Sequence, residues 1–232
     1  MRKILALALT LVLCFAALTS CSLFDLGDTD GVPTDDPKEL YRYAAKYMQE
    51  HAYKQTVVSM TYIDGELEDT TTEVTHYEGD NYYMDDENGM IVTYYDSVIY
   101  VQSVNGKKKM NMTVEQFADM IGLGEDFDFS IIDNIPDDDI AFTKNGDGTS
   151  TVDFVLEMPY LGPMSYSTII DSKGRIVEYT IDYTKTALGM TMRTVQKITV
   201  EYGDQYKVTP PAGADDYELT DDYMDLMGFG GL

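Results

Sequence analysis

The feature that most constrains the fold is a long series of segments in which apolar and polar residues alternate, with short turns between them. After residue 55, Val58, Met60 and Tyr62 alternate with Ser59 and Thr61, and similar segments recur up to residue 202. Alternation with a period of two is typical of a β-strand that buries one face. Short turns make consecutive strands antiparallel neighbours. The pattern predicts a long antiparallel meander and argues against a doubly wound α/β fold, which needs alternating helices and strands.

Glycine-containing turn sequences mark where the expected strands end. Asn105-Gly106 is the strongest hairpin signal, and segments 145–148 and 171–174 contain two more. These signals separate about ten or eleven strands. Because 44% of the residues are hydrophobic, the chain has enough apolar side chains for one domain with a substantial core.

Two helical segments accompany the strands. Asp36 before Pro37 is typical of a helix start, and apolar residues spaced three and four apart predict a helix over residues 37–52. Thr113 and Gln116 form the pattern of a capping box at the start of a second, short helix. We therefore expect an α+β fold: one strongly curved antiparallel sheet, a half-barrel, with two short helices covering its concave face.

The N-terminal segment has the pattern of a secretory signal. Arg2 and Lys3 precede an apolar run over residues 4–17, which is shorter than the roughly 18 to 20 residues that span a bilayer. The sequence Leu18-Thr19-Ser20-Cys21 then resembles the lipobox of bacterial lipoproteins. The alternative is an ordinary signal peptide with an unrelated cysteine near the cleavage point.

The lipoprotein resemblance implies that Cys21 receives a diacylglycerol and that the chain is cleaved before it. Two acyl chains anchor a protein stably, whereas one chain binds membranes only marginally. Cys14 leaves with the signal, so Cys21 is the one cysteine of the mature sequence and no disulfide forms within it. The expected location is the extracytoplasmic face of the cell membrane.

The chain is strongly acidic, with 41 Asp and Glu against 16 Lys and Arg and a formal charge of −25. All the acidic residues and 14 of the basic ones follow residue 20, so the mature chain has a formal charge of −27. Such a field repels nucleic acid and anionic lipid headgroups and favours cationic protein partners. We expect no nucleic-acid partner.

The composition changes along the chain define four expected regions. Residues 1–20 form the signal peptide, and residues 21–36 contain the lipidated cysteine and an acidic tether rich in Gly, Pro and Asp. Residues 37–217 form a single domain, which we expect to be monomeric, and residues 218–232 form a C-terminal tail.

Three segments resemble the lipoprotein-carrier (LolA-like) half-barrel family in their order of strands, turns and helix. They are NYYMDDENGMIVTYYDSVIYVQSVNGKKKMNMT, IIDSKGRIVEYTIDY and ITVEYGDQYKVTPPAGADD. The resemblance covers roughly residues 37–217 and implies a half-barrel whose concave face holds an acyl chain or another apolar ligand. This chain departs from the soluble carriers of that family in its expected anchor, its lack of Trp and its acidity.

No pattern of catalytic or metal-binding residues is present. His51 and His76 lack a nearby cysteine or a closely spaced second histidine. The acidic clusters at residues 85–87, 137–139 and 221–222 are typical of solvated surface. We expect a non-catalytic protein without cofactor or metal.

Met and Tyr residues on the strands and helices have two interpretations, as a packed core or as the lining of a cavity that accepts apolar ligands. The cavity candidates are Leu40, Tyr47, Met60, Tyr62, Met84, Tyr100, Phe117, Met164 and Tyr166. The first function we expect is therefore binding of a lipid or other apolar ligand between sheet and helices. The alternative is a cell-surface interaction or structural lipoprotein with a filled core.

The lipid anchor makes one direct prediction. Replacing Cys21 by Ala removes the sulfur that accepts the diacylglycerol, so the signal should stay uncleaved by the lipoprotein peptidase and acyl labelling should be lost. Metabolic labelling with a radioactive fatty acid measures this. Recovery of acyl-labelled Cys21→Ala protein in the membrane fraction would contradict the anchor.

Overall fold

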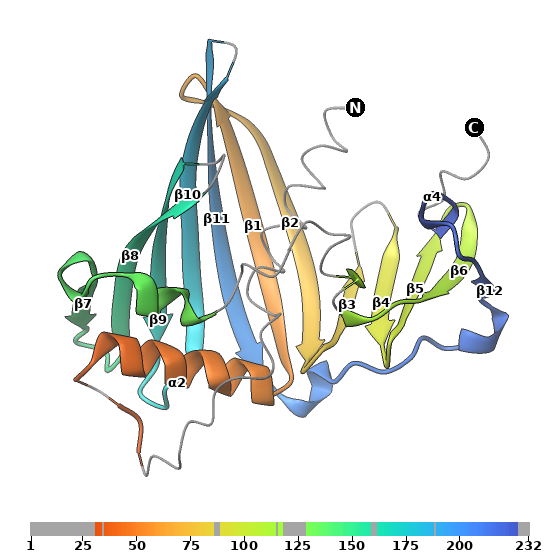
Figure 1. Ribbon diagram of the computed structural model, residues 1–232, viewed down its shortest axis with the longest axis horizontal. Helices are drawn as coiled ribbons and strands as arrows, with labels where there is room; N and C mark the ends of the chain where they lie inside the picture. Colours follow the sequence, from red (N-terminus) through yellow and green to blue (C-terminus); the bar gives the residue numbers. More distant parts are fainter. Residues whose placement is uncertain are drawn as a thin grey trace.

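Twelve strands form one sheet in the computed structural model, which describes residues 31–33, 35–85, 89–114, 116–117, 129–158, 162–187 and 189–226. The order across the sheet is β12-β6-β5-β4-β3-β2-β1-β11-β10-β9-β8-β7 (Figure 1). The strands are β1 (Tyr53–Ile63), β2 (Glu66–Glu78), β3 (Asn81–Asp85), β4 (Ile91–Tyr95), β5 (Val98–Ser103), β6 (Gly106–Asn111), β7 (Ala141–Lys144), β8 (Ser150–Met158), β9 (Gly162–Ile170), β10 (Ile176–Ala187), β11 (Met190–Tyr202) and β12 (Glu218–Leu219).

The helical elements are few and mostly short. They are the α-helices α2 (Pro37–Glu50) and α4 (Tyr223–Leu226) and the 3₁₀ helices η1 (Phe129–Asn134), η2 (Asp137–Asp139), η3 (Asp204–Tyr206) and η4 (Ala214–Asp216). The protein is therefore mostly β, with one long helix among the described residues.

The predicted antiparallel meander is confirmed. Strands β1 to β6 pair in succession, strands β7 to β11 do the same, and β1 pairs with β11 to join the two halves. The exception is β12, which pairs in parallel with β6 through Glu218 and Leu219. These residues belong to the segment that we expected to be a C-terminal tail, so the folded unit continues past residue 217.

The expectation of a strongly curved half-barrel is wrong. The sheet is open and is not strongly curled, and its two edge strands, β7 and β12, lie at opposite ends of it (Figure 1). Closure would require the edge strands to approach and pair. Here β7 has four residues and β12 has two, so neither offers a long ladder for such pairing.

The predicted turns lie where the sequence placed them. Asn105-Gly106 connects β5 to β6, and the Asp171 side chain holds the turn between β9 and β10. Its Oδ1 accepts hydrogen bonds from the backbone N–H groups of Lys173 (2.9 Å) and Arg175 (3.0 Å). Gly174 in this turn has a φ of +74°, and a Cβ there would lie 2.4 Å from Cε1 of Tyr43. Only glycine fits this close approach.

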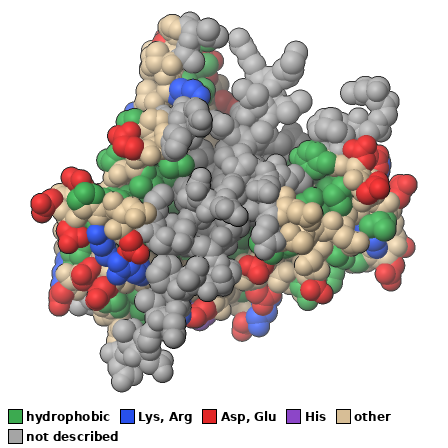
Figure 2. Space-filling model, in the orientation of Figure 1, with side chains coloured by type: hydrophobic (Ala, Val, Ile, Leu, Met, Phe, Trp, Pro, Cys, Tyr) green, Lys and Arg blue, Asp and Glu red, His purple; other side chains and the backbone are tan. Residues whose placement is uncertain are grey.

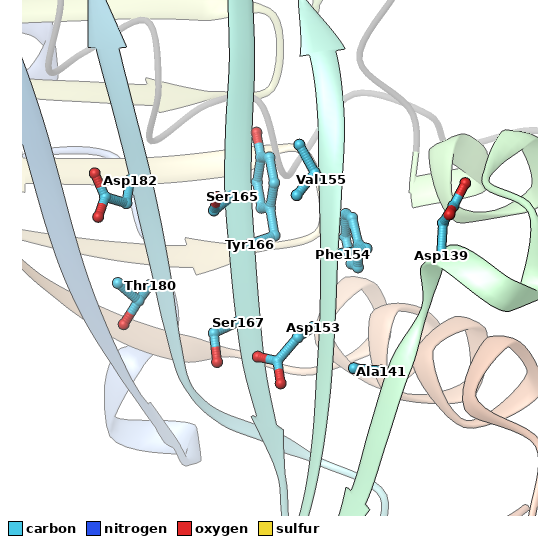
Figure 3. A pocket seen from close by; sticks show the side chains of 10 residues that line it. All are labelled: Asp139, Ala141, Asp153, Phe154, Val155, Ser165, Tyr166, Ser167, Thr180 and Asp182. Carbon is cyan, nitrogen blue, oxygen red and sulfur yellow. The ribbon is translucent and has the colours of Figure 1, made fainter.

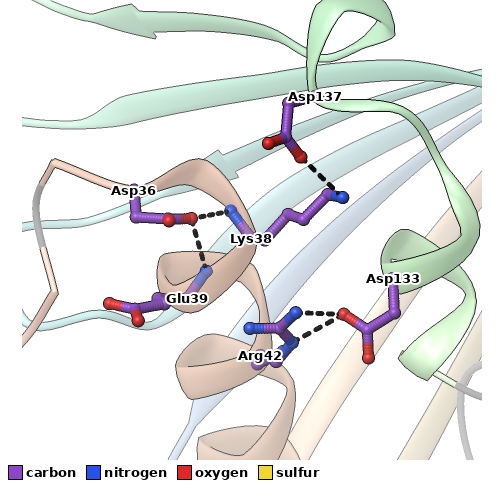
Figure 4. A network of polar contacts seen from close by, with 6 residues as sticks. All are labelled: Asp36, Lys38, Glu39, Arg42, Asp133 and Asp137. Carbon is purple, nitrogen blue, oxygen red and sulfur yellow. Dashed lines mark hydrogen bonds and ion pairs between the residues drawn. The ribbon is translucent and has the colours of Figure 1, made fainter.

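Helix α2 begins at the residue that the sequence indicated. The Asp36 carboxylate accepts hydrogen bonds from the backbone N–H groups of Lys38 (2.8 Å) and Glu39 (3.0 Å), as expected of an N-cap (Figure 4). Arg42 pairs with Asp133 of η1, and Lys38 pairs with Asp137 of η2 at 2.7 Å. These contacts hold the 3₁₀ segments against α2.

Helix α2 lies across one end of the strands β8 to β11 and defines the inner face of the sheet (Figure 1). The Tyr41 ring meets Phe154 edge-on with centroids 5.6 Å apart, and Tyr47 meets Tyr202 at 5.2 Å. Directly opposed residues of an antiparallel pair share a face. The strand register therefore assigns every strand residue either to this inner face or to the opposite, outer face.

The start of the second predicted helix is confirmed, and its remainder, residues 118–121, lies outside the described residues. Gln116 Oε1 accepts a hydrogen bond from the Thr113 backbone N–H (2.9 Å), and Thr113 Oγ1 accepts one from the Gln116 backbone N–H (3.3 Å). Phe117 packs against the rings of Tyr82 and Tyr94 with centroid distances of 5.1 and 5.0 Å. The capping box thus places Phe117 over the inner face of β3 and β4.

Candidate functional site

The inner face of the three central strands, β2, β1 and β11, is lined by polar side chains that are buried. We call these six residues the polar band. They are Gln55, Ser59, Glu73, Thr75, Thr194 and Gln196, each less than 9% exposed. The register shows that they face the same way, because Gln55 is opposite Thr75 and Ser59 is opposite Gln196.

Apolar side chains flank the polar band on both sides of the inner face. We call the buried group on β8, β9 and β10 the apolar wall. It consists of Phe154, Leu156, Met164, Tyr166, Ile181 and Tyr183. A second group, including Met84 and Val92, covers the inner face of β3 to β5. The centre of the inner face thus has polar and apolar side chains side by side, while its two flanks are mainly apolar.

Hydrogen bonds orient the two amides of the polar band. Gln196 Nε2 donates to Ser59 Oγ at 3.1 Å, and Gln55 Nε2 donates to the Tyr179 hydroxyl at 2.9 Å. Thr75 Oγ1 also donates to Glu73 Oε1 at 3.3 Å. In each glutamine the side-chain amide nitrogen donates a hydrogen bond to a hydroxyl of another strand. The side-chain carbonyl oxygen takes no part in that bond.

Several buried polar atoms on the inner face have no hydrogen-bond partner among the residues that the structure describes. They include Gln55 Oε1, Gln196 Oε1 and the hydroxyls of Tyr53 and Tyr166. Gln55 and Gln196 are 0% and 1% exposed. An unpaired buried polar group costs roughly 1 to 3 kcal/mol, so native proteins usually satisfy such groups with water or a ligand. Their concentration on one face marks the candidate site.

Burial keeps the phenols of the inner face protonated. It raises the pKa of Tyr53 well above its ordinary value, with smaller contributions from Tyr179 and Tyr202. Burial also raises the pKa of Tyr166, with a smaller contribution from Tyr41. The two unpaired hydroxyls therefore stay neutral at physiological pH, and each can donate or accept a hydrogen bond.

Six of the nine expected cavity residues are buried or half-buried on the inner side. Met84, Met164 and Tyr166 lie on the inner face of the strands, at 1%, 0% and 7% exposure. Leu40 and Tyr47 belong to α2, and Phe117 follows the capping box over β3 and β4. Met164 and Tyr166 both lie on β9, next to the residues of the apolar wall on β8 and β10.

The other three expected cavity residues, Met60, Tyr62 and Tyr100, lie on the outer face and so do not share a face with these six. Met60 and Tyr62 have the opposite orientation to Ser59, and the Tyr62 ring is 5.9 Å from the Arg193 guanidinium. Tyr100 packs edge-on against Tyr217 at 5.4 Å. On β1 the inward positions are Tyr53, Gln55, Val57 and Ser59, so Met60 and Tyr62 face outward.

Sequence reasoning missed the polar band itself. The signal that was present is the set of polar residues at alternate positions of β1, Gln55, Ser59 and Thr61, with Val57 between them. Such residues look like the solvent side of an amphipathic strand. Their pairing with Gln196 and Thr194 across β11 reveals the face that they share.

A concavity of about 440 Å³ lies on the outer face between β7 and β10 (Figure 3). Its polar lining comes from Asp139, Asp153, Asp182, Ser165, Ser167 and Thr180. The Asp182 carboxylate accepts a hydrogen bond from Arg193 Nε at 2.9 Å. The other polar groups are at least partly exposed, so they are accessible to water, unlike the buried unpaired groups of the inner face. This groove is therefore a weaker candidate than the inner face.

The described residues contain no group of three or more His, Cys, Asp or Glu side chains placed to hold a metal ion. His51 caps α2 and stacks on Tyr47 with centroids 3.8 Å apart. His76 lies between Tyr83 and Tyr206, at 5.5 and 5.3 Å. Both histidines thus make structural contacts with aromatic rings.

Comparisons with known proteins found no matching family model and no matching curated protein. Among solved structures, the chain is similar to the LolA superfamily protein NE2245 from Nitrosomonas europaea, at 10% identity and a TM-score of 0.31, over 72% of this chain and 92% of that one. It is also similar to a DUF1329 family protein from Desulfovibrio piger, at 13% identity and a TM-score of 0.28, over 75% and 96%.

A third solved structure, MucB in complex with MucA(peri), shares 8% identity over 72% of this chain and 98% of that one, with a TM-score of 0.14. Scores this low carry no information about function.

The unpaired hydroxyls make a prediction for stability. Tyr166→Phe removes a hydroxyl without a partner, so the free energy of unfolding should change by less than about 0.5 kcal/mol or rise. Tyr94→Phe is the matched control, because the Tyr94 hydroxyl donates to the Met112 carbonyl at 3.0 Å, and it should cost about 1 kcal/mol. Chemical denaturation measures both. An equal loss in the two variants would contradict the assignment of Tyr166.

Proposed function

We propose that this protein is a lipid-anchored, extracytoplasmic binding protein that holds an amphipathic ligand against the inner face of its sheet. The observation that supports this most directly is the set of unpaired, buried polar atoms at Gln55, Gln196, Tyr53 and Tyr166. A filled core would place apolar side chains at these positions, because burial of unpaired polar groups is costly. A ligand with polar groups would satisfy them.

The flanking side chains indicate the second part of the ligand. Met164 and Leu156 of the apolar wall belong to the buried hydrophobic cluster, at 0% and 8% exposure, and Phe154 stacks on Tyr166 with centroids 5.2 Å apart. An alkyl chain would therefore contact them in place of side chains that now cover them. Burial of an alkyl chain against such side chains contributes about 0.8 kcal/mol per methylene. Methionine side chains adapt to varied apolar shapes. An acyl or alkyl chain thus suits the wall, and a polar group suits the band.

The anchor and the location in this proposal rest on Leu18-Thr19-Ser20-Cys21, which lies outside the described residues. Among the described residues, no helix is both long and apolar enough to cross a membrane. A diacylglycerol on Cys21 would keep the domain beside a membrane, where amphipathic ligands are concentrated. The chain is proposed to act without catalysis, cofactor or metal.

The second candidate function is a surface interaction module for a cationic protein. The outer groove favours it, because Asp139, Asp153 and Asp182 line a concavity of about 440 Å³ in a strongly acidic chain. Electrostatic complementarity of this kind raises the rate of encounter with a basic partner. Ligand binding would use the inner face, and binding of a cationic protein would use the outer groove. Signals from residues on the two faces therefore distinguish the two candidate functions.

Methionine-methyl NMR of the full chain in phosphatidylcholine nanodiscs tests the proposal. Titration with 1-dodecanoylglycerol should shift the methyl signal of Met164 in a saturable way, because Met164 lies in the apolar wall. Met60 on the outer face is the internal control and should not move. Movement of neither signal, or of Met60 alone, would contradict inner-face binding.

A further inference from the structure

The polar-band atoms without a partner among the described residues, Gln55 Oε1 and Gln196 Oε1, are both hydrogen-bond acceptors. The amide nitrogens of Gln55 and Gln196 are engaged with Tyr179 and Ser59, and the carbonyl oxygens remain. An amide oxygen has two lone pairs and no proton to donate. A group that satisfies these atoms must therefore bring N–H or O–H donors of its own.

The charges around the polar band also suit a ligand group that brings N–H or O–H donors. Of the six residues of the band, one is acidic, Glu73, and none is basic. Asp69 lies on the same face, opposite Thr61 of β1. Acidic side chains also border the side of the molecule seen in Figure 2, within a chain of formal charge −25. This field disfavours anionic groups and accepts neutral or cationic ones.

We infer that the polar group of the ligand is a hydrogen-bond donor, a hydroxyl or a primary ammonium, received by the carbonyl oxygens of Gln55 and Gln196. The inference rests on the proposed function, since it specifies the ligand of the same site. Carboxylates and phosphates do not suit these two oxygens, because they would place acceptor against acceptor. Quaternary ammonium groups do not suit them either, because they carry charge without an N–H.

Four probes with the same twelve-carbon chain test the effect of a hydrogen-bond donor separately from the effect of charge. Dodecylammonium is a cationic donor, 1-dodecanoylglycerol is a neutral donor, dodecyltrimethylammonium is a cation without a donor, and dodecanoate is an anion without a donor. Each is titrated into the full chain in phosphatidylcholine nanodiscs while the Met164 methyl signal is followed. The two donors should bind about tenfold more tightly than the two probes without donors, which corresponds to one or two hydrogen bonds.

Two leucine variants test whether Gln196 causes the preference for probes with hydrogen-bond donors. Gln196→Leu removes one acceptor and should weaken both donor probes about three- to tenfold, with little change for dodecyltrimethylammonium. Gln102→Leu is the matched control, because Gln102 lies on the outer face of β5, and it should leave all four affinities unchanged. Circular dichroism and the remaining methionine signals confirm that each variant is folded.

The outcomes distinguish the inference from the proposed function. Similar affinities for dodecylammonium and dodecyltrimethylammonium, tighter binding of dodecanoate, or an unchanged donor preference in Gln196→Leu would overturn the inference while binding itself stands. Absence of any Met164 shift with all four probes would overturn the proposed function, and the inference with it.

Discussion

Buried polar groups need hydrogen-bond partners, and the inner face of this sheet has several that lack one among the described residues. The long strands β1, β2, β10 and β11 form the middle of one open sheet, and the inner face of that middle contains amides and hydroxyls as well as apolar groups. Gln55 and Gln196 are essentially inaccessible, yet each has a carbonyl oxygen without a partner among the described residues. A sheet of this size is stable only if the surrounding contacts offset that cost.

Those contacts come from the two flanks of the sheet. On one side, α2 places Tyr41 against Phe154 and Tyr47 against Tyr202, and ion pairs hold the 3₁₀ segments to the helix. On the other side, Phe117 packs on the tyrosines of β3 and β4. Both flanks are apolar and well packed. The packing of the flanks thus contributes to offsetting the cost of the buried polar groups between them.

The sequence predicted the local features of this structure well. Asp36, the Thr113–Gln116 capping box and the Asn105-Gly106 turn act through neighbours in the chain, so their side-chain chemistry is sufficient to locate them. Antiparallel order followed from the same turns. The curvature of the sheet did not, because it depends on how distant edge strands meet, and the parallel pairing of β12 with β6 has no local signal.

In the candidate site, too, some features follow from the local sequence and others depend on the pairing of distant strands. Met84, Met164 and Tyr166 lie on the inner face, where apolar residues alternate with polar ones. Met60 and Tyr62 lie on the outer face, and hydrophobic alternation indicates the buried face only where that face is apolar. On β1 the inner positions are Gln55, Val57 and Ser59. A buried face with polar side chains departs from the usual pattern, and the register with β11 reveals it.

The central claim is that the inner face of β1 and β11 receives a ligand and is not a closed core. A crystal structure of the full chain, purified from the cells that make it, tests this most directly at a resolution that shows ordered water. The account predicts an elongated non-protein molecule along the apolar wall, with a donor atom roughly 2.7 to 3.2 Å from Oε1 of Gln55 or Gln196. Both carbonyl oxygens paired only with water or with donors of the chain itself would contradict it.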